Sequence, residues 1–155
     1  MSQASRSKIV VGVDGSGSSL EALRWAVHQT NLTGATLHVV TAWGYPDHPT
    51  PFGIVPELPL PQDPMAETRR RLDEVVETAR RGDPNAEVRT EVVHGSAAPV
   101  LLQAARDADL LIVGSRGVGT FVGMLLGSVS EHCVRHASCP VLVVRSVHDA
   151  KADPR

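Results

Sequence analysis

The chain alternates short apolar segments with longer amphipathic segments along nearly its whole length. An alternation of strand and helix signals predicts parallel strands joined by crossover helices. The expected strands are residues 8–14, 36–43, 86–93, 110–113 and 139–144. With 155 residues the chain is long enough for one domain with a substantial core. We therefore expect a single α/β domain with a doubly wound five-stranded parallel sheet, order 3-2-1-4-5, and helices on both faces.

Amphipathic segments lie between the expected strands, and capping residues mark where three of them begin. We expect the first helix to open at the capping box Ser18–Glu21 and to stop near Gly34. The second helix is expected over residues 65–81. Ser96 and Ser128 are the expected caps of the third and fourth helices, with the glutamate three residues after Ser128 reaching back.

Residues 44–64 form a proline-rich stretch with seven prolines. Proline lacks an N–H group and fixes φ, so this stretch is neither a regular helix nor an interior strand. An irregular connection of this length is unusual in a compact domain, and a functional lid and a disordered flap both agree with the sequence. The ordered core of the domain, which spans 1–155, is expected over residues 8–145.

Charge and composition argue against several function classes. A formal net charge of -2 provides no basic field to recruit nucleic acid or an anionic membrane. The arginine runs at 69–71 and 80–81 are interpreted as solvated helix faces balanced by nearby acidic residues. No apolar stretch is long enough to span a bilayer, and residues 1–7 are polar, so we expect a cytoplasmic protein. Cys133 and Cys139 are expected to act as small buried hydrophobes.

A glycine-rich connection follows the fourth expected strand. It contains Gly114, Gly117 and Gly127, and Ser128 comes directly after the last of them. Glycine permits a positive φ and has no Cβ to obstruct an approaching oxygen. The unpaired amides at the start of the next helix attract anions, and Arg116 adds a permanent positive charge. The sequence therefore predicts a loop that binds phosphate.

A second polar turn is expected at the same edge of the sheet. In the order 3-2-1-4-5 the first and fourth strands are neighbours at the topological switch point, and ligands bind outside their carboxyl ends. Asp14 ends the first expected strand and Gly114 ends the fourth. Two motifs that are far apart in the sequence are therefore expected to converge on one crevice.

The pattern Gly-x2-Gly-x9-Gly-Ser resembles the ATP-binding signature of the universal stress protein family. Residues 9–16 are similar to the first strand and turn of that family, and residues 139–144 are similar to its last strand. The resemblance covers about residues 8–145 and implies ATP as the ligand, with or without Mg²⁺.

The resemblance also implies a role for each residue of the site. Asp14 and Gly15 would border the nucleotide, and the strand around Val39 would lie against adenine through backbone polar groups. The residues expected on the ribose and phosphate side are Gly114, Arg116 and Gly117. Those expected to donate amides and hydroxyls to the phosphates are Gly127, Ser128, Val129 and Ser130.

Signatures of fast catalysis and of metal centres are missing from the sequence. Lys8 and Lys151 are its only lysines, and both are distant from the loop, so no P-loop lysine is available. The Gly-x-Ser-x-Gly pattern of a hydrolase nucleophile elbow is absent. His132 and His136 share a helix face without the accompanying spacing of a metal centre. We expect no catalytic and no metal-ligating residues, and at most slow ATP hydrolysis.

Three function classes agree with these observations. The favoured one is a nucleotide-dependent regulatory module of the stress response, in which bound ATP changes shape or partners. A slow ATP hydrolase is the second. The third is a dimeric interaction protein whose site is empty or holds cyclic AMP. A homodimer is expected through the last strand, an apolar edge formed by Val141, Leu142, Val143 and Val144.

Overall fold

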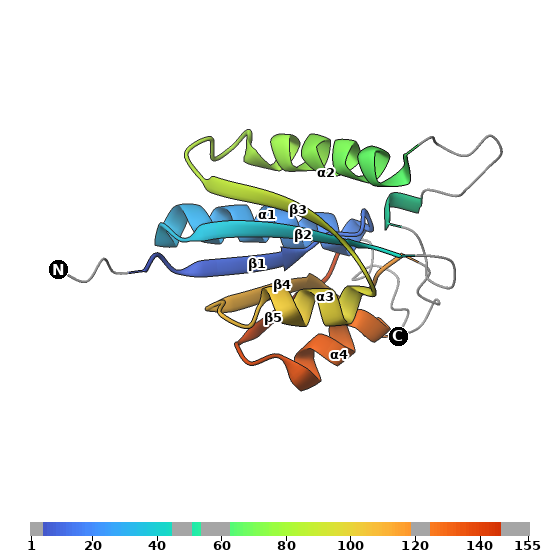
Figure 1. The fold of residues 1–155 in the computed structure, drawn as a ribbon. Helices are drawn as coiled ribbons and strands as arrows, with labels where there is room; N and C mark the ends of the chain where they lie inside the picture. Colours follow the sequence, from blue (N-terminus) through green and yellow to red (C-terminus); the bar gives the residue numbers. More distant parts are fainter. Residues whose placement is uncertain (1–4, 45–50, 54–62, 119–124, 147–155) are drawn as a thin grey trace, which may run out of the picture.

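The computed structural model describes residues 5–44, 51–53, 63–118 and 125–146. Strands and helices alternate along them. The elements are β1 (Lys8–Gly12), α1 (Gly17–Thr33), β2 (Thr36–Trp43), the short 3-10 helix η1 (Pro51–Gly53), α2 (Pro64–Arg80), β3 (Glu87–His94), α3 (Ala97–Ala104), β4 (Leu110–Gly114), α4 (Ser128–His136) and β5 (Val141–Val144). The strands form one parallel sheet in the order β3-β2-β1-β4-β5 (Figure 1). The predicted fold class and strand order are therefore confirmed.

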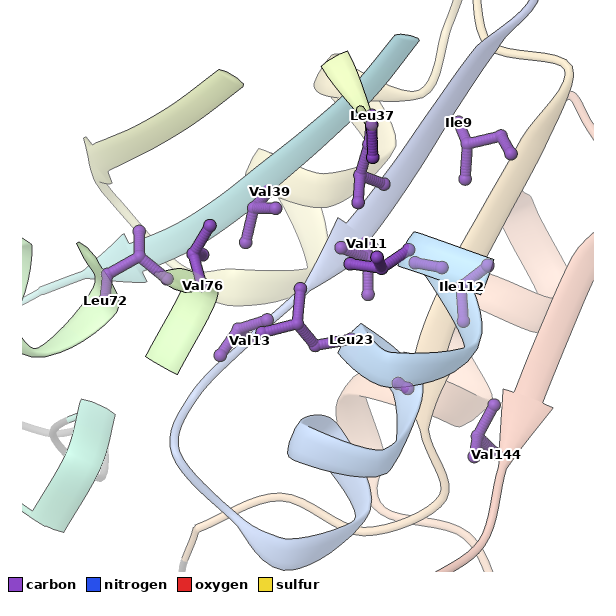
Figure 2. Packing of buried hydrophobic residues seen from close by; sticks show 14 of the residues in the cluster. Ile9, Val11, Val13, Leu23, Leu37, Val39, Leu72, Val76, Ile112 and Val144 are labelled. Atoms are coloured by element: carbon purple, nitrogen blue, oxygen red, sulfur yellow. The ribbon is translucent and has the colours of Figure 1, made fainter. Parts of the chain in front are cut away.

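The two faces of the sheet are covered by different helices. Helices α1 and α2 pack on one face, and α3 and α4 pack on the other (Figure 1). Successive residues of a strand point to opposite faces, so Val11 of β1 joins the core under α1 and α2 while Val10 joins the core under α3 and α4. Figure 2 shows Val11, Leu23 and Leu37 gathered in the first of these cores. Burial on both faces explains the continuous apolar runs of the central strands.

The predicted N-caps of two helices differ from the observed ones by one or two residues. The N-cap of α1 is Ser16, whose side chain accepts a hydrogen bond from the Ser19 amide, whereas Ser18 lies buried inside the first turn. Gly15 adopts a φ of 87°, and this turn allows the helix to begin earlier than the capping box suggests. The N-cap of α4 is Gly127, so Ser128 is the first helical residue and does not cap.

The remaining helix ends agree with the sequence in position, but two of the expected capping contacts are not made. Gly34 ends α1 in the left-handed conformation, with a φ of 71°, as its position predicted. Ser96 occupies the N-cap of α3 but makes no capping hydrogen bond with its side chain. Helix α2 begins at Pro64 behind the cap Asp63, because proline suits the first helical position. Glu131 pairs with an arginine one turn later and does not reach back to the start of α4.

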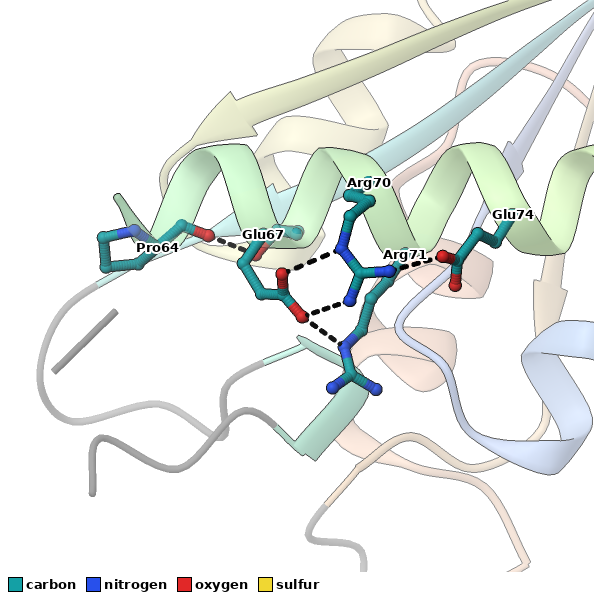
Figure 3. Close-up of polar contacts among 6 residues, drawn as sticks. Pro64, Glu67, Arg70, Arg71 and Glu74 are labelled. Carbon is teal, nitrogen blue, oxygen red and sulfur yellow. Dashed lines mark hydrogen bonds and ion pairs between the residues drawn. The ribbon is translucent and has the colours of Figure 1, made fainter. Parts of the chain in front are cut away.

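The arginine run on α2 is balanced by acidic side chains. The Glu67 carboxylate accepts hydrogen bonds from Arg70 and Arg71, and Arg70 also pairs with Glu74 (Figure 3). The hydrogen bond from Arg70, followed by that from Arg71, lowers the pKa of Glu67 to about 2. These contacts confirm the interpretation of residues 69–71 as part of a solvated helix face.

Several other expectations meet the structure only in part. Most of the proline-rich stretch, residues 45–50 and 54–62, lies outside the described residues, and so does the choice between lid and flap. Cys133 is buried as predicted, and burial raises the pKa of its thiol to about 11. Among the helices that the structure describes, none combines the length and the apolar character that crossing a membrane requires.

Candidate functional site

A cleft of about 360 Å³ opens at the carboxyl ends of the strands, on the side of the sheet that carries α3 and α4. A volume of this size falls in the usual range for small-molecule sites. The ends of β1, β2 and β4 and the first turns of α1, α3 and α4 surround it. The predicted site residues that line it are Asp14, Gly114, Arg116, Gly117, Ser128, Val129 and Ser130. The two motifs do converge on one crevice, at the switch point between β1 and β4.

Three predicted site residues do not line the cleft. Val39 is fully buried in the core under α1 and α2, and its neighbour Val40 faces the cleft in its place. Gly15 packs directly against Phe52. A Cβ on Gly15 would lie 2.6 Å from a ring carbon of Phe52, so a side chain at this position would overlap the ring. Gly127 is the N-cap of α4 and closes the loop by donating its N–H to the carbonyl of Ser115 at 2.7 Å.

The Asp14 carboxylate connects the turn after β1 to the glycine-rich loop. Its Oδ2 accepts the Val118 N–H at 2.8 Å, across 104 residues of sequence, and its Oδ1 accepts the Ser16 N–H at 2.9 Å. The Ser16 hydroxyl lies 2.5 Å from the same Oδ1. Both carboxylate oxygens therefore hold the protein backbone, and Asp14 lines the cleft as a part of this frame.

Two glycines of the motif, Gly114 and Gly117, are needed for close packing and not for a special φ. Neither Gly114, Gly117 nor Gly127 has a positive φ, which corrects the expectation from the sequence. A Cβ on Gly114 would lie 2.5 Å from Ser18 Oγ and 2.7 Å from the Ser18 backbone, so the loop passes directly over the first turn of α1. A Cβ on Gly117 would lie 2.7 Å from Asp14 Oδ2. The spacing of Gly114 and Gly117 is thus matched to the first turn of α1 and to the Asp14 turn.

The Ser130 hydroxyl serves the loop and not the open cleft. It donates to the carbonyl of Ser115 or of Gly127, each 3.0 Å away, and the residue is only 2% exposed. In this structure the hydroxyl is engaged with the loop backbone, and its donation to a phosphate stays a prediction. What Ser130 offers at the cleft is its place in the first turn of α4.

The electrostatics of the cleft favour an anion. The first turns of α3 and α4 both border it; the Ser96 side chain makes no capping hydrogen bond at the start of α3, and the N-cap of α4 is Gly127, which has no side chain. Helix N-termini carry a partial positive charge and Arg116 adds a full one, while the negative charge of the Asp14 carboxylate is offset by the Ser16 and Val118 amides that donate to it. His132 lies at the cleft with its ring centroid 4.5 Å from that of His136. Within the described ranges, no group of three or more His, Cys, Asp or Glu residues is arranged to hold a metal ion.

Sequence reasoning missed the serines of α1 and the contribution of α3. Ser16 and Ser18 follow Asp14 closely, and the hydroxyls of both serines donate to the Arg116 carbonyl. Several serines directly after an Asp-Gly turn are the sequence signal that could have indicated such contacts. The residues Ala97 and Ala98 at the cleft carry no polar side chain that would mark them in the sequence. Lys8 stands at the other end of β1 and pairs with Asp107, which agrees with its predicted distance from the loop.

A doubly wound α/β domain with a glycine-rich loop and two helix N-termini at its switch point belongs to a class of folds that receive anionic ligands. Residues 5–145 match the model of the Universal stress protein family. The chain is a member of the universal stress protein family.

Similar curated proteins support this membership. A universal stress protein of Mycobacterium tuberculosis is 33% identical over 144 residues, which cover 93% of this chain and 50% of the relative. A second one from the same organism is 35% identical over 156 residues and covers 95% of this chain and 50% of its own length. The chain thus spans about half the length of these curated relatives.

Solved structures share the fold. A universal stress protein in complex with cAMP is 29% identical, with a TM-score of 0.62, and the match covers 91% of this chain and 98% of that one. A universal stress protein family member from Arabidopsis thaliana with AMP bound is 21% identical, with a TM-score of 0.66, over 93% of this chain and 94% of that one. At this lower identity the likeness concerns the fold alone.

Proposed function

We propose that the cleft binds an adenine nucleotide, with ATP as the physiological ligand. One observation carries the proposal: the glycine-rich loop and the first turns of α3 and α4 meet at a single cleft of about 360 Å³ beside Arg116. Backbone amides at helix starts and a guanidinium group suit phosphate oxygens. The 29% identical relative that was solved with cAMP supports an adenine nucleotide and leaves cAMP as the competing ligand.

The residues around the cleft suggest how the ligand would lie. Ser128 and Val129 at the start of α4 would receive the phosphates, and Arg116 would add charge on the same side. The base would enter between the end of β2, near Ala42, and the first turn of α3. In this arrangement the Asp14 carboxylate is already bonded to two amides, so a Mg²⁺ ion would be held mainly by the nucleotide.

We propose a regulatory role in the stress response in preference to an enzymatic one. The described residues place no lysine at the cleft to hold a transferred phosphoryl group, and the Asp14 carboxylate is engaged with the backbone, which leaves the His132 imidazole as the remaining base among the described residues that line the cleft. Hydrolysis of ATP is therefore expected to be far slower than about 1 per second, which is the lower end for typical enzymes. A steady-state assay with ATP and Mg²⁺ tests this: faster turnover that is lost in Arg116→Ala would identify an ATPase.

The identity of the ligand is tested on the protein as purified. Denaturing fresh protein and analysing the supernatant by mass spectrometry is expected to release ATP in near-stoichiometric amounts. Release of cAMP would instead favour the competing ligand. An empty site that also fails to bind added nucleotide would remove the proposal.

We also propose a homodimer through the free edge of β5. The Leu111 N–H donates to the Pro140 carbonyl and the Ser115 N–H to the Val144 carbonyl, so alternate residues of β5 face β4. Val141 and Val143 therefore direct their backbone groups to the open edge. A two-fold axis would pair this edge with its copy.

The dimer is tested by removing one edge donor. Val143→Pro deletes an N–H that is not used within the sheet and is expected to give a monomer in sedimentation experiments at micromolar concentration. Val143→Ala keeps that donor and serves as the control, because it should remain dimeric. A monomeric unmodified protein would contradict the proposal.

A further inference from the structure

Ser18 is a buried polar residue that contacts the glycine-rich loop without lining the cleft. It is 3% exposed, and its hydroxyl donates to the Arg116 carbonyl at 2.5 Å and accepts the Arg116 N–H at 3.2 Å. These two residues are 98 positions apart in the sequence. One side chain thus satisfies both backbone groups of a single residue in the loop.

The two bonds fix the part of the loop that faces the cleft. Arg116 lies between Gly114 and Gly117, two residues after the end of β4. A hydroxyl bonded to both the N–H and the carbonyl of Arg116 restrains the peptide planes on either side of it. The Asp14 carboxylate restrains the next stretch through the Val118 N–H. The orientation of the loop amides therefore depends on the first turn of α1.

The absence of a Cβ on Gly114 makes this contact possible. Any Cβ there would overlap Ser18 Oγ, at 2.5 Å, and the backbone of α1, at 2.7 Å. The Ser16 hydroxyl also lies 3.1 Å from the Arg116 carbonyl, but it is closer to Asp14. Ser18 therefore bonds to both backbone groups of Arg116, whereas Ser16 reaches the carbonyl.

We propose that Ser18 is a positioning residue for the nucleotide phosphates: it holds Arg116 and the adjoining amides in the orientation that receives them. This inference rests on the proposed nucleotide binding and deepens it. Ser18 acts through Arg116 and does not contact the ligand, since it is not among the residues that border the cleft. Its loss should loosen the loop while leaving the strands in place.

The test compares Ser18→Ala with a matched control, Thr68→Val. Thr68 is fully buried and donates to the Pro64 carbonyl within α2, so Thr68→Val also removes one buried hydroxyl but leaves the loop untouched. Calorimetry with ATP is expected to give an affinity about tenfold weaker for Ser18→Ala, as the loss of a hydrogen bond or two predicts, and an unchanged affinity for Thr68→Val.

Amide hydrogen exchange supplies the readout that general destabilisation would not produce. In the protein without ligand, Ser18→Ala should speed exchange of the Arg116 N–H while Val11 in β1 keeps its protection. Equal ATP affinity in Ser18→Ala and the unmodified protein would overturn the inference, as would unchanged Arg116 exchange. If Ser18→Ala does not fold, Ser18→Cys, with its weaker hydrogen bonds, takes its place. Failure of the unmodified protein to bind ATP would instead defeat the proposed function, and the exchange result would still decide whether Ser18 holds the loop.

Discussion

The two faces of the sheet differ in what they bury and in what they leave open. Under α1 and α2 the core is closed, with Leu23, Leu37 and Leu72 almost completely inaccessible. Under α3 and α4 the core is smaller, and its carboxyl end opens into the cleft beside Leu101. The same strands serve both faces through alternate residues. The face under α1 and α2 therefore holds most of the buried apolar residues, whereas the face under α3 and α4 is less completely packed and contains the cleft.

The first turn of α1 joins these two regions. The helix packs in the closed core through Leu23, yet Ser16 and Ser18 at its start bond to the loop that borders the cleft. A change in the closed core is therefore expected to affect stability alone unless it displaces this turn.

Leu23→Ala should have the largest effect on stability. Leu23 is 1% exposed in the closed core, so its truncation leaves a cavity that is expected to cost about 2–5 kcal/mol of unfolding free energy. Leu32→Ala on the same helix is the control, because Leu32 is 65% exposed. Denaturant titration measures both. Weakened ATP binding by folded Leu23→Ala would break the proposed separation of the two faces.

Gly114→Ala should affect both regions together. The new Cβ would meet the backbone of α1 at 2.7 Å, and a backbone atom cannot move aside as the end of a side chain can. We expect a loss of about 1–3 kcal/mol of stability, as for overpacking, together with weaker ATP binding. Gly82→Ala is the control, since a Cβ there meets nothing within 4 Å. Similar melting curves for the two variants would contradict the packing argument.

His38 should produce a small pH effect at the amino ends of the strands, far from the cleft. Burial, followed by the charges of Lys8 and Arg89, lowers the pKa of His38 from 6.5. The unfolded chain then binds the proton at a higher pH than the folded one, so stability should fall as the pH drops below about 6.5. His38→Gln should lose less stability between pH 7.5 and pH 5.5 in urea titrations. An identical loss in both proteins would show that other groups control the response.

The sequence predicted the sheet well because apolar segments and turns are local signals. The β2 boundaries at Thr36 and Trp43 coincide with those expected, and the strand order followed from the alternation of strands and helices. The sequence could not predict which of Val39 and Val40 faces the cleft. A strand buried on both faces has no alternation of polar and apolar residues, so its phase becomes visible only once the helices are in place.

The candidate site was predicted in its location but not in its internal contacts. Asp14 and Gly117 were placed at one crevice, as the structure confirms, yet their mutual contact depends on how α1 meets the loop. The role of Ser18 is hidden for the same reason, because its partner Arg116 is distant in the sequence. Long-range hydrogen bonds between a side chain and the backbone carry no periodic signal in the sequence.

The open face is proposed to bind a nucleotide through the glycine-rich loop, and a titration with ATP tests whether binding depends on that loop. ATP is added to the unmodified protein and to Gly117→Val in a calorimeter, after melting curves have verified that both are folded. A Cβ on Gly117 would already lie 2.7 Å from Asp14 Oδ2, so the branched side chain should displace the loop. Binding through the loop predicts stoichiometric uptake of ATP by the unmodified protein and none by Gly117→Val. Equal affinity in the two proteins, or no binding by the unmodified protein, would contradict it.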